Sequence, residues 1–146
     1  MGWLFGAKKE KPPAAATHDA APRADIPPFR YLADAQTYGA ALNGIAFTCR
    51  NPDADTAAFA EQLADAYGRR RDAIAAFISA DEDFQAVYGP LAPDALADRL
   101  GPPSVLLLDG RLGQITYCRS TLDAVHIIGL EFSGVFEELF YLSIDG

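Results

Sequence analysis

Apolar residues recur at helical spacing along one long run of the chain. Between residues 53 and 79 the large apolar side chains lie mainly three, four or seven positions apart, at Phe59, Leu63, Tyr67, Ile74, Phe77 and Ile78. This period predicts one amphipathic helix that ends near Ser79. Asp53 or Asp55, just before the run, is of the residue type that caps a helix N-terminus.

Two shorter helices are predicted after the long one. The first runs from about Asp81 to Tyr88 and breaks at Gly89-Pro90. The second, from about Asp94 to Leu100, follows a proline and stops at Gly101, which is the usual asymmetry of helix ends.

The remaining apolar runs have the two-residue period of strands. Asn43-Gly44 and Ser133-Gly134 each separate two such runs and predict tight hairpins, because a type I′ turn needs positive φ at both central residues. The last strand is apolar on both sides, so we expect it to be central or covered on both faces. Seven strands are expected, three before the helices at 29–32, 37–42 and 45–49, and four after them at 104–108, 114–118, 125–132 and 135–144.

This order of elements predicts an α+β fold, because strands, helices and strands follow one another in blocks. We expect an antiparallel sheet, made of N-terminal hairpin strands and a C-terminal four-strand meander, packed against one long and two short helices. The length of 146 residues suits one domain, from about residue 28 to 146. Residues 1–27, rich in Ala and Pro, predict a disordered leader.

The charge of the chain lies mostly in the predicted domain. Residues 28–146 hold 8 basic and 17 acidic side chains, a net charge of −9, and contain no lysine. Such a surface disfavours nucleic acid and favours a basic macromolecular partner, although acidity also serves plain solubility. No signal peptide or membrane span is visible, so a cytoplasmic location is expected.

The leader suggests a weak contact with membrane surfaces. An apolar patch, Trp3, Leu4 and Phe5, precedes a basic cluster, Lys8, Lys9 and Lys11. Such a segment is able to enter lipid headgroups and meet anionic lipid, which makes the chain a possible membrane-proximal adaptor. The alternative is a leader without a binding role, because so short an apolar patch is too weak to hold a membrane alone.

Few residues are suited to catalysis. His126 with Glu131 or Glu138 is the candidate acid/base set; His126 and Glu131 lie an odd number of positions apart, so they share a face only if Gly129 introduces a bulge. A structural histidine is the simpler interpretation. The P-loop, dinucleotide and hydrolase motifs are absent, and we expect a protein that is not an enzyme and has no cofactor.

Neither a metal site nor a disulfide is predicted. Cys49 and Cys118 have no zinc-type spacing, and each is expected to be a small buried thiol in a strand. Arg69, Arg70 and Arg71 form the one dense basic patch of the domain; they suit either contact with a carboxylate or phosphate, or simply the solvated side of the long helix.

The order of segments in residues 29–146 resembles that of bacterial domains of unknown function of the DUF2262 and DUF2004 type. The resemblance is carried by the Asn-Gly hairpin, the long helix, the stretch 88–100, the strand that starts at Pro103-Ser104-Val105, and the end Ser143-Ile144-Asp145-Gly146. It supplies no catalytic residue. Small acidic α+β proteins are also similar in fold and charge to immunity proteins of bacterial toxin systems. We therefore expect a non-catalytic protein that docks a basic partner.

Overall fold

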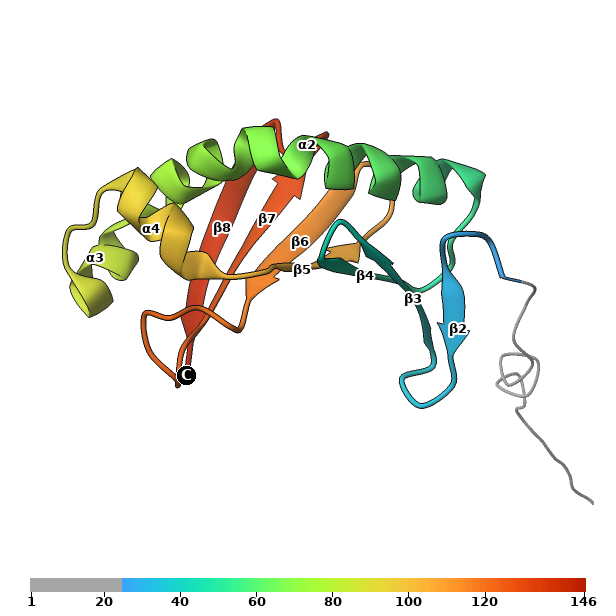
Figure 1. Cartoon of the computed structure of the whole chain (residues 1–146), viewed down its shortest axis with the longest axis horizontal. Helices are drawn as coiled ribbons and strands as arrows, with labels where there is room; N and C mark the ends of the chain where they lie inside the picture. Colours follow the sequence, from blue (N-terminus) through green and yellow to red (C-terminus); the bar gives the residue numbers. More distant parts are fainter. Residues whose placement is uncertain (1–24) are drawn as a thin grey trace, which may run out of the picture.

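Seven strands form one sheet and follow one another in chain order from edge to edge (Figure 1). The computed structural model describes residues 25–146. The strands are β2 (Arg30–Leu32), β3 (Thr37–Leu42), β4 (Ile45–Cys49), β5 (Ser104–Leu107), β6 (Leu112–Tyr117), β7 (Ile127–Ser133) and β8 (Glu138–Asp145). The helices are α2 (Ala54–Ser79), α3 (Glu82–Tyr88) and α4 (Pro93–Leu100). The expected α+β class and the three helices are confirmed.

The sheet is mixed, because one of its strand pairs is parallel. β4 and β5 run in the same direction, with Phe47 opposite Val105, whereas every other neighbouring pair is antiparallel. The expectation of an antiparallel sheet throughout is therefore wrong at this pair. The three helices form the crossover that a parallel pair requires, and they return the chain to the start of β5.

The hairpin between β3 and β4 is the one predicted from Asn43-Gly44. Asn43 has φ 51° and Gly44 has φ 79°, the positive values of a type I′ turn, and Leu42 pairs with Ile45. The side-chain amide of Asn43 also donates to the carbonyl of Ala64 in α2 at 3.2 Å. The turn therefore fixes the hairpin and ties it to the long helix.

The second predicted tight hairpin is instead a four-residue turn, 134–137, with Ser133 opposite Glu138. Phe136 explains the difference. Its side chain is buried, 4.7 Å from the ring of Phe132 and 6.0 Å from that of Tyr67. A two-residue loop would have placed this ring in the strand rather than under α2.

β8 lies at the edge of the sheet, not at its centre as expected. A bulge makes two of its residues, Tyr141 and Leu142, oppose Leu130 alone, since Gly129 pairs with Ser143 and Glu131 with Phe140. The bulge shifts the alternation by one position. Leu139 before the bulge and Leu142 and Ile144 after it therefore all pack against the core under the helices, whereas Phe140 pairs with Glu131 on the open face.

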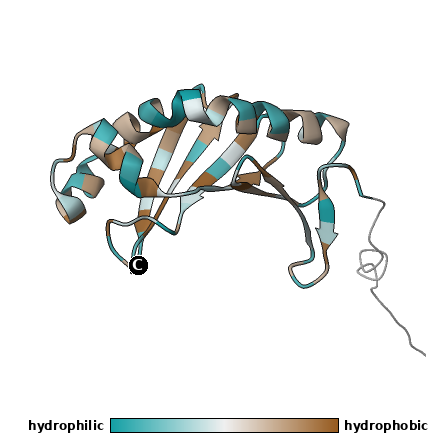
Figure 2. Ribbon diagram, in the orientation of Figure 1, coloured by the Kyte–Doolittle hydropathy of each residue, from teal (hydrophilic) through white to brown (hydrophobic). Residues whose placement is uncertain are grey.

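α2 crosses one face of the sheet and carries much of the core (Figure 1). Its N-cap is Asp53, and its buried residues include Phe59, Leu63, Ile74 and Ile78. Figure 2 shows apolar and polar bands alternating along α2 and along the strands beneath it. None of the helices in residues 25–146 is long and apolar enough to cross a membrane.

The opposite face of the sheet is open to solvent. The register places Thr48, Leu106, Gln114 and Glu131 in one row across it, with Leu106 and Gln114 exposed. We call this surface the open face.

Candidate functional site

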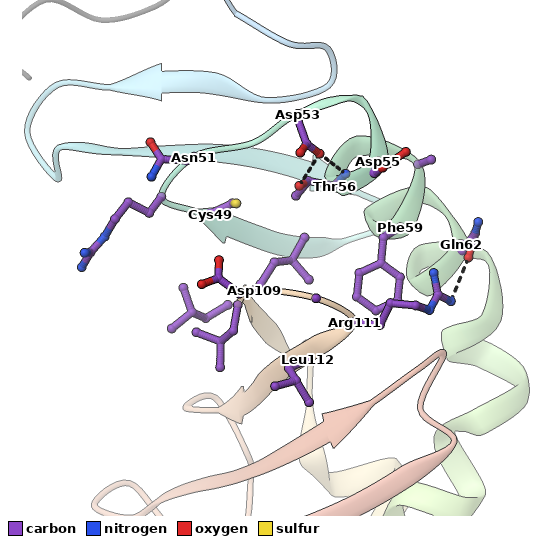
Figure 3. Close-up of a pocket in the computed structure, with 16 residues that line it drawn as sticks. Cys49, Asn51, Asp53, Asp55, Thr56, Phe59, Gln62, Asp109, Arg111 and Leu112 are labelled. Atoms are coloured by element: carbon purple, nitrogen blue, oxygen red, sulfur yellow. Dashed lines mark hydrogen bonds between the residues drawn. The ribbon is translucent and has the colours of Figure 1, made fainter.

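A groove of about 1060 Å³ lies where β4 and β5 end, beside the first turns of α2 (Figure 3). The parallel pair creates it. Both strands end at the same edge, with Cys49 opposite Leu107, and the chain then leaves in two directions. From β4 it continues into α2, and from β5 it turns back into β6. Carboxyl ends of parallel strands are a common place for binding sites in α/β sheets.

Three aspartates lie along the groove: Asp53, Asp55 and Asp109. Asp53 Oδ1 accepts hydrogen bonds from the backbone N–H of Thr56 at 2.8 Å and from its hydroxyl at 2.9 Å. Both bonds lower the pKa of Asp53, and the bond from the backbone N–H has the larger effect. Asp55 and Asp109 are exposed, and neither forms an ion pair within residues 25–146. Arg50 and Arg111 also line the groove, but neither forms an ion pair with these carboxylates within the described residues, and the three aspartates outnumber them.

Cys49 lies between two of these carboxylates. Burial raises the pKa of its thiol, the N–H of Asn51 lowers it, and the charges of Asp53 and Asp109 raise it further. The net direction is upward, so the thiol stays protonated and is a poor nucleophile.

Arg111 is held on the helix side of the groove. Its guanidinium lies 4.5 Å from the centre of the Phe59 ring, and Nη2 donates to Gln62 Oε1 at 3.3 Å. A cation over an aromatic face is attracted by the ring quadrupole, typically by about 0.5–1 kcal/mol at exposed sites. Figure 3 shows Arg111 turned toward Phe59 and Gln62, on the side away from Asn51.

Three exposed leucines adjoin the carboxylates. Leu106, Leu108 and Leu112 are 38%, 44% and 44% exposed. Leu106 pairs with Gln114, and the N–H of Leu108 donates to the carbonyl of Leu112, so the alternation places all three on the open face. We call them the leucine cluster.

The sequence pattern did not reveal this groove. The sequence indicates only a helix cap at Asp53 or Asp55, and only strand positions at Leu106 and Leu108. The missing information was the parallel pairing of β4 with β5, because it alone brings residues 49–62 beside residues 106–112.

His126, the predicted acid/base candidate, has a different carboxylate partner. It lies just before β7, and its Nδ1 is 2.7 Å from Asp123 Oδ2. Asp123 Oδ1 accepts from the backbone N–H groups of Val125 and His126. The hydrogen bond from the backbone N–H of His126 holds the pKa of Asp123 well below its usual range, and the contact with the His126 ring is the second cause. Asp123 therefore closes the turn before β7 and orients the imidazole.

Tyr88 completes this cluster. Its ring lies 5.8 Å from that of His126, nearly perpendicular to it. Its hydroxyl is buried close to Asp123 without a well-aligned hydrogen bond. Burial, and then the neighbouring carboxylate, raise the pKa of Tyr88 to about 12.

Glu131 and Glu138 do not join His126. Glu131 lies on the open face between Gln114 and Phe140, five residues along the chain from His126, or about 16 Å in an extended strand. Glu138 begins β8 and accepts from the hydroxyl of Ser133 at 3.0 Å, at the far end of β7. The bulge considered at Gly129 of β7 does not occur: the register shifts after Gly129, but the extra residue lies in β8, so β7 keeps its alternation.

Two of the three predicted arginines of α2 make side-chain contacts, each with a different partner. Arg69 donates to the carbonyl of Asp65 at 3.1 Å, and Arg71 pairs with Asp98 at 3.3 Å; both are exposed, whereas Arg70 is half-buried. An exposed pair of this kind is typically worth about 0–1 kcal/mol. Arg71 thus ties α2 to α4 loosely.

The remaining predictions concern the two cysteines, a metal site and the N-terminal tail. Cys49 is buried as expected, but Cys118 is exposed just beyond the end of β6, so the expectation of a second buried thiol is wrong. Within residues 25–146 no group of His, Cys, Asp and Glu is arranged to hold a metal ion. The tail residues Trp3, Leu4, Phe5, Lys8, Lys9 and Lys11 lie outside the described residues.

Comparison with known proteins finds no match, either among family models or among curated proteins and solved structures. The resemblance to the DUF2262 and DUF2004 domains stays a prediction from the sequence.

Proposed function

We propose that the chain is a non-catalytic, cytoplasmic binding protein whose acidic domain docks a basic protein partner. The observation that carries the proposal is the combination, in one groove, of unpaired carboxylates and the leucine cluster. The surrounding domain, residues 28–146, has a net charge of −9. An acidic surface that docks a basic partner is also what the similarity in fold and charge to immunity proteins suggests.

The two parts of the groove support different aspects of docking. Exposed apolar side chains that lie together favour a protein partner, because burying them removes apolar area from water at about 25 cal/mol per Å². The carboxylates favour a positively charged partner, since complementary charge raises the rate of association and excludes acidic competitors.

The ionisable groups of the groove favour binding over catalysis. Cys49 keeps its proton, and Asp53 is engaged as the cap of α2. Neither is in the state that nucleophilic or general-base chemistry requires near neutral pH.

The proposal is tested by cross-linking the tagged full-length chain in the cells that express it. We expect one stoichiometric partner with a basic surface. The complex, formed again from the two purified proteins without cross-linker, should dissociate as salt is raised from about 0.05 to 0.5 M, because salt screens exposed charges. Recovery of no stoichiometric partner, or of an acidic one, would contradict the proposal.

One observation favours a second candidate, a small enzyme that uses His126. A carboxylate on Nδ1 orients an imidazole and leaves Nε2 as the reactive nitrogen, and Asp123 occupies that position at 2.7 Å. The test is complementation of a deletion strain with His126→Gln. If His126 is catalytic, the variant should fold but fail to restore the wild-type phenotype. Full restoration of the phenotype would exclude the enzyme.

A further inference from the structure

We infer that the groove at the ends of β4 and β5 binds a short extended segment of the partner in which a lysine or arginine lies within two positions of a bulky apolar residue. This inference rests on the proposed function and adds the site and the chemistry of the bound segment. The cation is assigned to Asp53 and Asp109, and the apolar side chain to the leucine cluster.

Asp53 and Asp109 both lie near Cys49 and together favour a cation in this part of the groove. Figure 3 shows their side chains on either side of Cys49, and both charges act on its thiol. Asp53 uses Oδ1 for Thr56 and has no hydrogen bond on Oδ2 within the described residues. Because Asp109 is also unpaired, an entering ammonium or guanidinium finds carboxylate oxygens from two directions.

An anionic ligand fits the same place poorly. The first turn of α2 would attract an anion through its free N–H groups, but Asp53 already accepts from the N–H of Thr56, and Asp55 adds a second negative charge in that turn. Arg50 and Arg111 offset these charges only in part, because three aspartates line the groove and the Arg111 guanidinium is held against Phe59 and Gln62.

The apolar contact lies directly beside the cation site. Asp109 follows Leu108 in the chain, and both residues line the groove. The partner's basic and apolar side chains must therefore also be close in its sequence. The volume of about 1060 Å³ is slightly larger than the roughly 300–1,000 Å³ of small-molecule pockets, which leaves room for several side chains.

The test uses three dye-labelled hexapeptides, with blocked ends, and the full-length protein at about 50 mM NaCl. One alternates leucine and lysine, the second has glutamate in place of lysine, and the third has serine in place of leucine. Fluorescence anisotropy gives the Kd of each. We expect the leucine-lysine peptide to bind at least 10-fold more tightly than either of the others.

Two variants and two matched controls locate the site. Asp109→Asn and Leu108→Ser each change an exposed groove residue and should each weaken the leucine-lysine peptide about 5-fold or more. Asp72→Asn, on the exposed side of α2, and Val125→Ser, 65% exposed beyond the far end of β6, make the same chemical changes elsewhere. They should change the Kd less than 2-fold.

The outcomes separate the inference from the proposed function. If the three peptides bind alike, or if the groove variants bind like their controls, the inference is overturned, and the cross-linked partner still decides whether the protein docks a basic protein. If both groove variants also lose that partner while the controls keep it, the inference is supported on the natural complex. A missing partner refutes the proposed function, whatever the peptides do.

Discussion

A hydrogen bond between two tyrosines fastens the long helix to the sheet, and its removal gives a quantitative test of the core. Tyr67 on α2 and Tyr117 at the end of β6 have hydroxyl oxygens 2.7 Å apart. Tyr117 has 0% exposure and Tyr67 is half-buried. Burial raises the pKa of both groups, most strongly that of Tyr117, so both hydroxyls are neutral over the physiological range.

The two single substitutions should have unequal costs. Tyr67→Phe leaves the Tyr117 hydroxyl buried without a partner, and an unsatisfied buried polar group costs about 1–3 kcal/mol. Tyr117→Phe leaves Tyr67, which is partly accessible and able to bond water, so we expect about 1 kcal/mol, the ordinary net value of a hydrogen bond. The double variant removes donor and acceptor together and should cost less than the two singles summed, with a coupling energy of about 1–2 kcal/mol.

Urea unfolding followed by far-UV circular dichroism measures the free energies of unfolding. Tyr141→Phe, at a position 75% exposed, is the matched control and should be neutral. Equal slopes against urea are required for the comparison. Single effects that add within about 0.3 kcal/mol, or a neutral Tyr67→Phe, would refute the view that the buried hydroxyl depends on this bond.

Three further predictions test other features. Gly68→Ala should stabilise the protein by about 0.5–1 kcal/mol, because an added methyl on α2 meets nothing within 4 Å. Gly113→Ala should destabilise it by about 1–3 kcal/mol in the same urea assay, because its Cβ would lie 2.3 Å from the Phe132 ring. The pKa of Asp123 is lower in the folded protein than its unfolded value near 3.9, so its charge stabilises the fold above that pH, and this stability is lost as the pH falls. In thermal unfolding, Asp123→Asn should therefore destabilise more at pH 7 than at pH 3. An equal effect at both pH values contradicts this. Deleting residues 1–12 should abolish co-sedimentation with anionic liposomes if the tail is an anchor; unchanged sedimentation excludes that role.

Local chemistry made most of the elements predictable. The Asn43-Gly44 turn, the Asp53 cap and the apolar spacing of α2 each depend on residues that are neighbours in sequence, and each is found as expected. The bulge at Tyr141 was not predictable, because it depends on which β7 residues β8 opposes. The position of Phe136 was likewise not predictable, because the residue lies in the turn before β8 and packs against Tyr67 of α2.

The candidate site was less predictable than the fold. His126 was identified, but its partner proved to be Asp123 in the preceding turn rather than a carboxylate on a strand. The groove was missed, since Asp53 and Asp109 are far apart in sequence and no motif links them.

Periodicity, turn chemistry and charge are properties of short segments, so the α+β class, the long helix, the hairpin at residues 43–44 and the acidity of residues 28–146 all follow from the amino-acid sequence. The parallel pairing of β4 with β5, the edge position of β8 and the meeting of acidic and apolar residues at one end of the sheet are visible only in the folded chain. These depend on pairings between distant segments, where the free energy comes from burying a shared face and not from any one segment's preference.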